Sequence, residues 1–274
     1  PTPAPTTSPT PAPTTSPTPA PTTSPTGGGG SATQDVHFKY PGGGLADFRG
    51  RPEVLYSLII SDNAHVNFRV QNSSFHLNGA LIHGTFITEV HAMARDPRDG
   101  AGWLNASFWA DRVGPHNYAW DMITAACGPA HFTIGPKSRH TCGENSLVVD
   151  YSTLHFKAPG LAVHVTTQPV YDRVAGPTHR LDVRVDGWSA DAQMHGILGQ
   201  GLLDPLRRGK VDVYPTSGEY TTSAWAEGAI DGQPQQYEVS SKYATNSVFH
   251  AHHATRSRKT QGLNAEAKGM LSAA

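Results

Sequence analysis

A proline-rich repeat fills the first 26 residues and limits what this part of the chain can fold into. Three copies of Pro-Thr-Pro-Ala-Pro-Thr-Thr-Ser are followed by Pro-Thr, so ten of the 26 residues are proline. Proline fixes φ near about −65° and removes the backbone donor, which excludes helix and sheet. The repeat also has no charged or aromatic side chain to bury. We therefore expect an extended polyproline II rod, about 80 Å long at about 3.1 Å per residue.

The repeat is also rich in hydroxyl groups, with ten threonines and three serines. Tracts of threonine, serine and proline are typical of O-glycosylated stalks. Eight residues are not a multiple of the three per turn of polyproline II, so sugars would surround the rod. The alternative is an unmodified flexible linker. The candidate O-glycosylation positions are Pro3, Pro5, Thr6, Thr7, Ser8, Pro9, Pro11, Pro13, Thr14, Thr15, Ser16, Pro17, Pro19, Pro21, Thr22, Thr23, Ser24 and Pro25.

The spaced Ala-Pro, Ser-Pro and Thr-Pro pairs of the repeat resemble the glycomodules of hydroxyproline-rich glycoproteins from plant and green-algal cell walls. That resemblance implies hydroxylation of the prolines and covalent arabinose or galactose glycans. It further implies an extracellular or cell-surface location. Bacterial and fungal enzymes also carry Pro-Thr linkers.

Composition changes abruptly after the repeat. Residues 27–34 begin with Gly-Gly-Gly-Gly-Ser, which predicts a flexible hinge and is also typical of engineered linkers. All charged residues lie from Asp35 onward, so we expect a folded domain over 35–250 and a basic, small-residue tail over 251–274. The net charge of −1 argues against a nucleic-acid partner. No run approaches about 18 apolar residues, so membrane insertion is not expected.

The two cysteines, Cys127 and Cys142, bracket a turn-rich loop. An even cysteine count beside a glycosylated stalk predicts an extracellular disulfide, although two free buried thiols remain the alternative. Closing a loop of this size stabilises the fold by about 3 kcal/mol. The sequons at Asn72 and Asn105 are candidate N-glycosylation sites. We therefore predict a secreted protein.

The region after the hinge is dominated by strand signals. Residues 54–60, 65–70, 75–78, 80–90, 146–150, 153–157, 161–167, 179–185 and 237–239 are short apolar or alternating runs separated by turn residues. In 179–185, Leu181, Val183 and Val185 alternate with charged residues, which predicts a sheet with one solvated face. We expect an all-β fold of two packed antiparallel sheets, with weak helical periodicity only in 263–272.

Several short motifs of this domain resemble plant root-cap/late-embryogenesis-like proteins, whose relatives are the von Willebrand factor type D domains. They lie at 36–40, 44–50, 55–62, 195–200 and 240–246, and the likeness spans about 35–250. It implies a type-D-like sandwich. The chain has Gln34 and Val36 where the family opens Gly-Asp-Pro-His-Phe, and His195-Gly-Ile-Leu-Gly where type D domains have Cys-Gly-Leu-Cys-Gly. The segment that follows has one carboxylate, too few for a calcium site of the family type.

Few sequence patterns indicate metal binding or catalysis. His250 and His252 would share a strand face and could chelate zinc or copper, but no third ligand is identifiable, so we expect no metal and no cofactor. The sequence lacks the Gly-x-Ser-x-Gly, His-Glu-x-x-His and phosphate-loop motifs. Trp103 and Trp109 fall on one side of a strand and could bind sugar, although core packing is the simpler interpretation.

These observations favour a structural, non-enzymatic role. The leading hypothesis is a subunit of an extracellular glycoprotein fibre or cell-surface matrix, assembling with copies of itself through the β domain and the glycosylated rod. The first alternative is a secreted carbohydrate-binding module on a stalk. The second is a secreted glycan-active enzyme with two catalytic carboxylates that the sequence does not single out.

Overall fold

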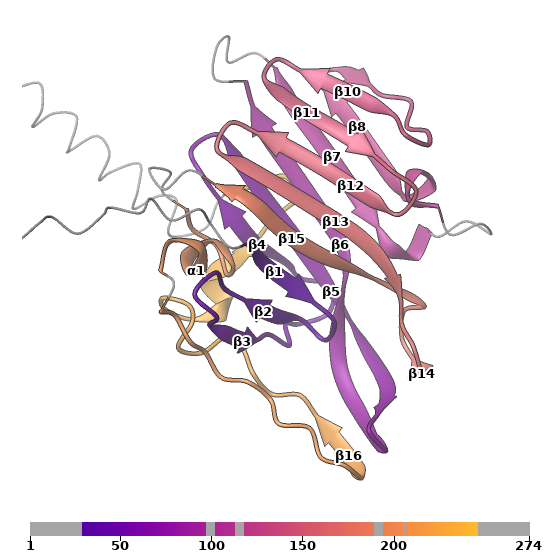
Figure 1. Cartoon of the computed structure of the whole chain (residues 1–274), viewed down its shortest axis with the longest axis vertical. Helices are drawn as coiled ribbons and strands as arrows, with labels where there is room; N and C mark the ends of the chain where they lie inside the picture. The colour runs from indigo at the N-terminus through magenta and orange to yellow at the C-terminus, as the bar shows by residue number, and fades with distance from the viewer. Residues whose placement is uncertain (1–28, 97–101, 113–117, 189–193, 205, 246–274) are drawn as a thin grey trace, which may run out of the picture.

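Two β-sheets packed face to face form the body of the molecule (Figure 1). The computed structural model describes residues 29–96, 102–112, 118–188, 194–204 and 206–245. Within these ranges the prediction of an all-β fold with two antiparallel sheets is confirmed. The predicted polyproline II rod, the helical periodicity at 263–272 and the tail at 251–274 lie outside the described residues.

The first sheet has eight strands, each antiparallel to its neighbours. In spatial order they are β10 (Arg139–Cys142), β11 (Asn145–Val149), β12 (Thr153–Ala158), β13 (Leu161–Pro169), β15 (His179–Trp188), β1 (Gly30–Thr33), β2 (His37–Lys39) and β3 (Leu45–Asp47). The N-terminal strand β1 therefore lies beside the late strand β15, pairing Ala32 with Val183.

The second sheet has nine strands. The main path is β17 (Glu238–Val239), β4 (Leu55–Ile60), β5 (Ala64–Leu77), β6 (Ala80–Arg95), β7 (Trp103–Trp109), β8 (Ile123–Cys127) and β9 (Ala130–His131). Strand β14 (Arg173–Ala175) adds to β5, and β16 (Gly218–Thr221) adds in parallel to β6. Four short helical elements complete the described chain: η1 (Ala110–Arg112), η2 (Ala119–Met122), α1 (Gly199–Leu203) and η3 (Pro234–Tyr237).

The alternation read from the sequence places the main core between the sheets. Leu181, Val183 and Val185 of β15 are buried, while Arg184 between them is exposed. The residues of β12 and β13 alternate in the same way. This alternation explains why one face of the eight-stranded sheet is polar and solvated, as in antiparallel sheets generally.

More residues of the nine-stranded sheet are buried than of the eight-stranded sheet, because the last described segment of the chain covers part of it. All six residues of β4 are buried. The side chain of Asn67 donates to the carbonyls of Lys242 and Ala244, and the Ser107 hydroxyl lies 2.6 Å from that of Tyr243. Among the described residues, no helix has the length and apolar character needed to cross a membrane.

The hinge predicted at 27–34 is wrong from Gly30 onward, because Gly30–Thr33 form β1 in the interior of the eight-stranded sheet. A Cβ at Gly30 would lie 2.5 Å from Leu202 Cδ2, so glycine serves close packing here. Ala32 is fully buried between β15 and β2. Flexibility was inferred from composition alone, and tertiary pairing overrides it.

Candidate functional site

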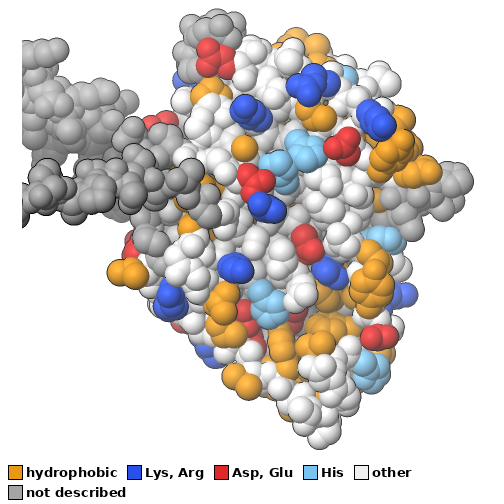
Figure 2. All heavy atoms as spheres, viewed as in Figure 1, with side chains coloured by type: hydrophobic (Ala, Val, Ile, Leu, Met, Phe, Trp, Pro, Cys, Tyr) orange, Lys and Arg blue, Asp and Glu red, His pale blue; other side chains and the backbone are white. Residues whose placement is uncertain are grey.

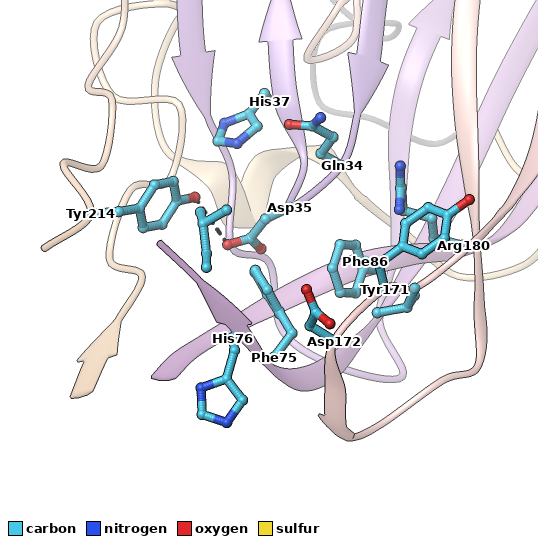
Figure 3. Close-up of a pocket in the computed structure, with 12 residues that line it drawn as sticks. Gln34, Asp35, His37, Phe75, His76, Phe86, Tyr171, Asp172, Arg180 and Tyr214 are labelled. Carbon is cyan, nitrogen blue, oxygen red and sulfur yellow. Dashed lines mark hydrogen bonds between the residues drawn. The ribbon is translucent and has the colours of Figure 1, made fainter. Parts of the chain in front are cut away.

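An open pocket of about 210 Å³ lies where the turn after β1 meets the long β5–β6 hairpin (Figure 3). Aromatic rings and a few polar groups line it, a combination typical of ligand sites. The lining residues are Gln34, Asp35, His37, Phe75, His76, Leu77, Phe86, Val170, Tyr171, Asp172, Arg180 and Tyr214. They come from both sheets and from three connecting segments, so the pocket exists only in the folded chain.

A strained turn carries Asp35 into this pocket. The turn joins β1 to β2, and the residues on either side of Asp35 have positive φ, 56° at Gln34 and 37° at Val36. This backbone conformation is uncommon outside glycine and costs most at a β-branched residue such as valine. The Gln34 N–H donates to Asp182 Oδ1 (3.1 Å), and the Val36 carbonyl accepts from the Phe48 N–H (3.1 Å). These contacts hold the turn that presents the carboxyl group.

The Asp35 carboxyl group is buried and hydrogen-bonded on both oxygens. The Thr85 N–H donates to Oδ1 (2.7 Å), and the Tyr214 hydroxyl donates to Oδ2 (3.1 Å). A Cβ at Gly84 would overlap the carboxylate, so the glycine in β6 makes the space that Asp35 occupies. Burial raises the pKa of Asp35 to about 6, despite these hydrogen bonds.

A second buried carboxylate, Asp47 in β3, lies next to Asp35. Its Oδ1 is 2.6 Å from Nδ1 of His37, and its Oδ2 accepts from the Asp212 N–H (2.8 Å). Burial opposes charge on His37, but the hydrogen bond to Asp47 and the nearby charges of Asp47, Asp35 and Asp212 together outweigh it, and the pKa of His37 is raised. The carboxylates around His37 therefore favour its imidazolium form.

Asp212 is the third buried aspartate of this group. Its carboxylate accepts from the Tyr220 hydroxyl (2.8 Å), from the Ser223 N–H (3.0 Å) and from the Ala224 N–H (3.1 Å). Burial favours the neutral form of Asp212, but the hydrogen bonds from Ala224, Tyr220 and Ser223 together outweigh it, and its pKa is lowered. The three buried aspartates together join five separate stretches of chain behind the pocket, and we call them the carboxylate network.

Aromatic side chains form the outer walls. The Phe75 and Phe86 rings lie 5.2 Å apart, and the Arg180 guanidinium lies over the Phe86 ring at 5.7 Å. Tyr171 is 71% exposed at the mouth, which is a large exposed area for an aromatic residue. Such rings stack on the faces of compact ring-shaped ligands such as prolines or sugars. Among the described residues, no group of three or more His, Cys, Asp or Glu side chains is placed to hold a metal.

The residues predicted from the sequence lie elsewhere. Cys127 and Cys142 are joined by the predicted disulfide, with a Cα–Cα distance of 5.6 Å. Asn72 is exposed on β5. Asn105 is half-buried in the interior of β7, and the hydroxyl of its sequon residue, Ser107, is buried. N-glycosylation stays a prediction at both sites, and the geometry favours Asn72.

The structure describes only some of the other site residues predicted from the sequence. Trp109 is buried and its ring contacts Arg112 (3.7 Å) and Lys242 (4.6 Å), which agrees with packing. The O-glycosylation positions within 1–26 and the pair His250 and His252 lie outside the described residues. No predicted site residue of the described chain lines the pocket.

The sequence contained one signal for the pocket that the motif analysis missed. Asp35 and His37 are the aspartate and histidine of Gln34-Asp-Val-His-Phe38, the segment that resembles the Gly-Asp-Pro-His-Phe opening. Tyr214 and Asp212 have no local signature, because they reach the site through tertiary contacts across 179 and 165 residues. Comparison with known proteins does not extend these observations, since no protein-family model and no curated protein matches the chain.

Proposed function

We propose that this chain is a structural subunit of an extracellular glycoprotein fibre or cell-surface matrix. In this proposal the proline-rich rod of one copy docks into the aromatic pocket of another. The observation that carries it is the pairing, in one chain, of a 26-residue proline repeat with an open pocket walled by Phe75, Phe86, Tyr171 and Tyr214. Aromatic-lined grooves bind polyproline II segments at low entropic cost, because the ligand is already extended.

The lengths of the two parts support contacts between copies. A polyproline II rod of 26 residues spans about 80 Å. A compact domain of about 215 residues has a diameter of about 45 Å. The rod therefore reaches well beyond its own domain. Contact between different surfaces on successive copies does not close on itself, and such head-to-tail contact produces filaments.

The position of β1 also supports docking of the repeat into the pocket of another copy. The chain enters β1 at Gly30 and reaches the pocket only at Gln34, after the strand. The repeat therefore joins the domain at the end of β1 that is remote from the pocket. To occupy its own pocket, the repeat would have to reverse its course within the three glycines that precede Gly30.

The chemistry of the domain suits an extracellular setting. The Cys127–Cys142 disulfide links β8 to β10. Disulfides of this kind persist in oxidising compartments. The buried carboxylate network provides a rigid wall against which a proline ring or a hydroxylated, glycosylated one could pack.

Sedimentation velocity of the full chain over a range of concentrations tests the proposal. We expect concentration-dependent association that weakens at least about tenfold in Tyr171→Ala, because exposed aromatic anchors carry much of the binding energy. Tyr151→Ala is the matched control, since Tyr151 is also exposed (53%) and does not line the pocket. A synthetic peptide of residues 1–24 should compete with association. A chain that stays monomeric at high concentration would overturn the proposal.

A carbohydrate-binding role is the second candidate, and a different surface favours it. The rings of Tyr118 and Trp120 are stacked at 4.1 Å, and Tyr151 lies 6.0 Å from Trp120. Aromatic platforms of this type bind the faces of sugar rings. Glycan-array binding that is lost in Tyr151→Ala but kept in Tyr171→Ala would favour this function over the fibre.

A further inference from the structure

Two histidines on the solvated face of the eight-stranded sheet meet directly across neighbouring strands. His155 of β12 is paired in register with His164 of β13, and their Nδ1 atoms lie 2.6 Å apart. Figure 2 shows histidine side chains on this face, grouped with acidic and basic ones over the middle of the sheet. Both side chains are about one-third exposed, so an ion can reach them from solvent.

A carboxylate holds the far nitrogen of each ring. His155 Nε2 lies 3.2 Å from Asp150 Oδ2, and His164 Nε2 lies 3.0 Å from Asp186 Oδ2. An ionised carboxylate accepts hydrogen bonds only, so each Nε2 must carry its proton. In a neutral imidazole the other nitrogen then has a free lone pair. The short Nδ1–Nδ1 contact therefore needs a cation between the rings: either a second proton on one ring, which then donates to the other, or a metal ion bound by both lone pairs.

This arrangement matches the surroundings of histidines that bind metals. Metal-bound histidines usually donate their second ring N–H to a carboxylate, which fixes the tautomer and the ring orientation. Here both rings have that partner, and Asp186 is itself held by Arg184 (2.5 Å). The strands below are rigid, because Leu154, Phe156, Val163 and Val165 on their opposite face are buried in the core.

We propose that His155 and His164 form a two-histidine site for a divalent transition metal, with copper(II) preferred and water completing the coordination. Imidazole nitrogen suits copper, nickel and zinc, and copper(II) binds most tightly of the three to such ligands. With bonds of about 2.0 Å, neighbouring nitrogens lie about 2.8 Å apart in a square-planar complex and about 3.3 Å apart in a tetrahedral one. The observed spacing is closer to the square-planar value, and small ring rotations supply the difference.

The site is independent of the pocket and of the fibre proposal. It also differs from the His250 and His252 pair considered from sequence, which lies outside the described residues. Those tail histidines would bind copper(II) themselves, so the reference protein is the full chain carrying His250→Gln, His252→Gln and His253→Gln. Every further variant is made in this background.

Titration with copper(II) alone, followed by calorimetry and electron paramagnetic resonance, tests the proposal. We expect one site with two coordinated imidazole nitrogens in the reference chain. Affinity should fall at least tenfold in His155→Gln and equally in His164→Gln. His131→Gln, at an exposed histidine of β9, is the matched control and should bind as the reference does.

Two results would overturn the proposal: unchanged affinity in both single variants, or a spectrum with at most one nitrogen ligand. A measurement without substitution guards against misfolded variants. Copper(II) is paramagnetic, so substoichiometric addition should broaden the imidazole NMR signals of His155 and His164 before those of other described histidines. Broadening that begins elsewhere in the domain also contradicts the site.

Discussion

The two ends of the sandwich are closed by different chemistry. At the end formed by β8 and β10, the Cys127–Cys142 disulfide ties the two sheets together, and the Phe132 ring stacks on His140 at 4.4 Å. The hairpin of β5 and β6 forms the opposite end (Figure 1), where three buried aspartates hold the chain. We call these the disulfide end and the pocket end.

Comparing the disulfide end with the pocket end shows how the wall of the pocket is formed. A disulfide joins two residues and needs no further partners. A buried carboxylate has several lone-pair positions and must collect donors from different segments, because a buried charge is costly unless it is hydrogen-bonded. At the pocket end this requirement draws the segments around residues 35, 47, 212 and 223 to one place. The hydrogen bonds of these carboxylates therefore hold the wall of the open pocket in place.

Removing Asp212 should give the largest effect. Asp212→Ala leaves the Tyr220 hydroxyl and the Ser223 and Ala224 N–H groups without their acceptor. We expect the free energy of unfolding to fall by about 4 kcal/mol, measured by urea denaturation. Asp62→Ala, at an exposed aspartate, should change it by less than about 0.5 kcal/mol. Equal effects of the two variants would show that the network does not stabilise the pocket end.

The pH dependence of stability tests the burial of Asp35. Its pKa is raised from 3.8 to about 6, so the folded chain binds this proton more tightly than the unfolded chain. The free energy of unfolding should therefore fall as pH rises from about 4 to about 6, by about 3 kcal/mol in total, and then level off. Denaturation curves of Asp35→Asn should lack this component. Parallel pH profiles for the two proteins would contradict the prediction.

Breaking the disulfide tests the opposite end. The double variant Cys127→Ser and Cys142→Ser opens a loop with a sequence separation of 15 residues. The loss of chain constraint should lower the free energy of unfolding by about 3 kcal/mol. The pocket end should be unaffected, so the difference in pH profile between Asp35 and Asp35→Asn chains should persist in this background. Loss of that difference would mean that the two ends are coupled.

Filling the space behind Asp35 should give the smallest effect. The added methyl of Gly84→Ala would overlap the Asp35 carboxylate and push it from its donors. We expect a loss of about 2 kcal/mol in the free energy of unfolding, as for other overpacked sites. Gly135→Ala is the control, since no atom lies within 4 Å of its added carbon. Equal unfolding midpoints for the two variants would show that the turn carrying Asp35 is free to move.

The sequence predicted strands where an alternating or apolar run marks them, but it missed others with a buried face, such as β8. The alternation in β15 and the short apolar run of β4 both identified their elements. The runs at 65–70 and 75–78 are one continuous strand, β5, because Gln71 and Asn72 between them pair with β6 despite their polar side chains. The sequence missed β1, because composition indicates flexibility for Gly30 and Ser31 whereas pairing with β15 and β2 fixes them.

The sequence by itself determined the all-β class and pointed to the one possible disulfide, because alternation and cysteine count are local properties. Proline chemistry likewise predicts that the repeat forms neither helix nor sheet. Only the tertiary structure decided the functional surfaces. Asp35 meets Tyr214 at a sequence separation of 179 residues, and His155 faces His164 through strand register. These contacts depend on which strands pair and in what register. No local pattern in a single sequence encodes that pairing.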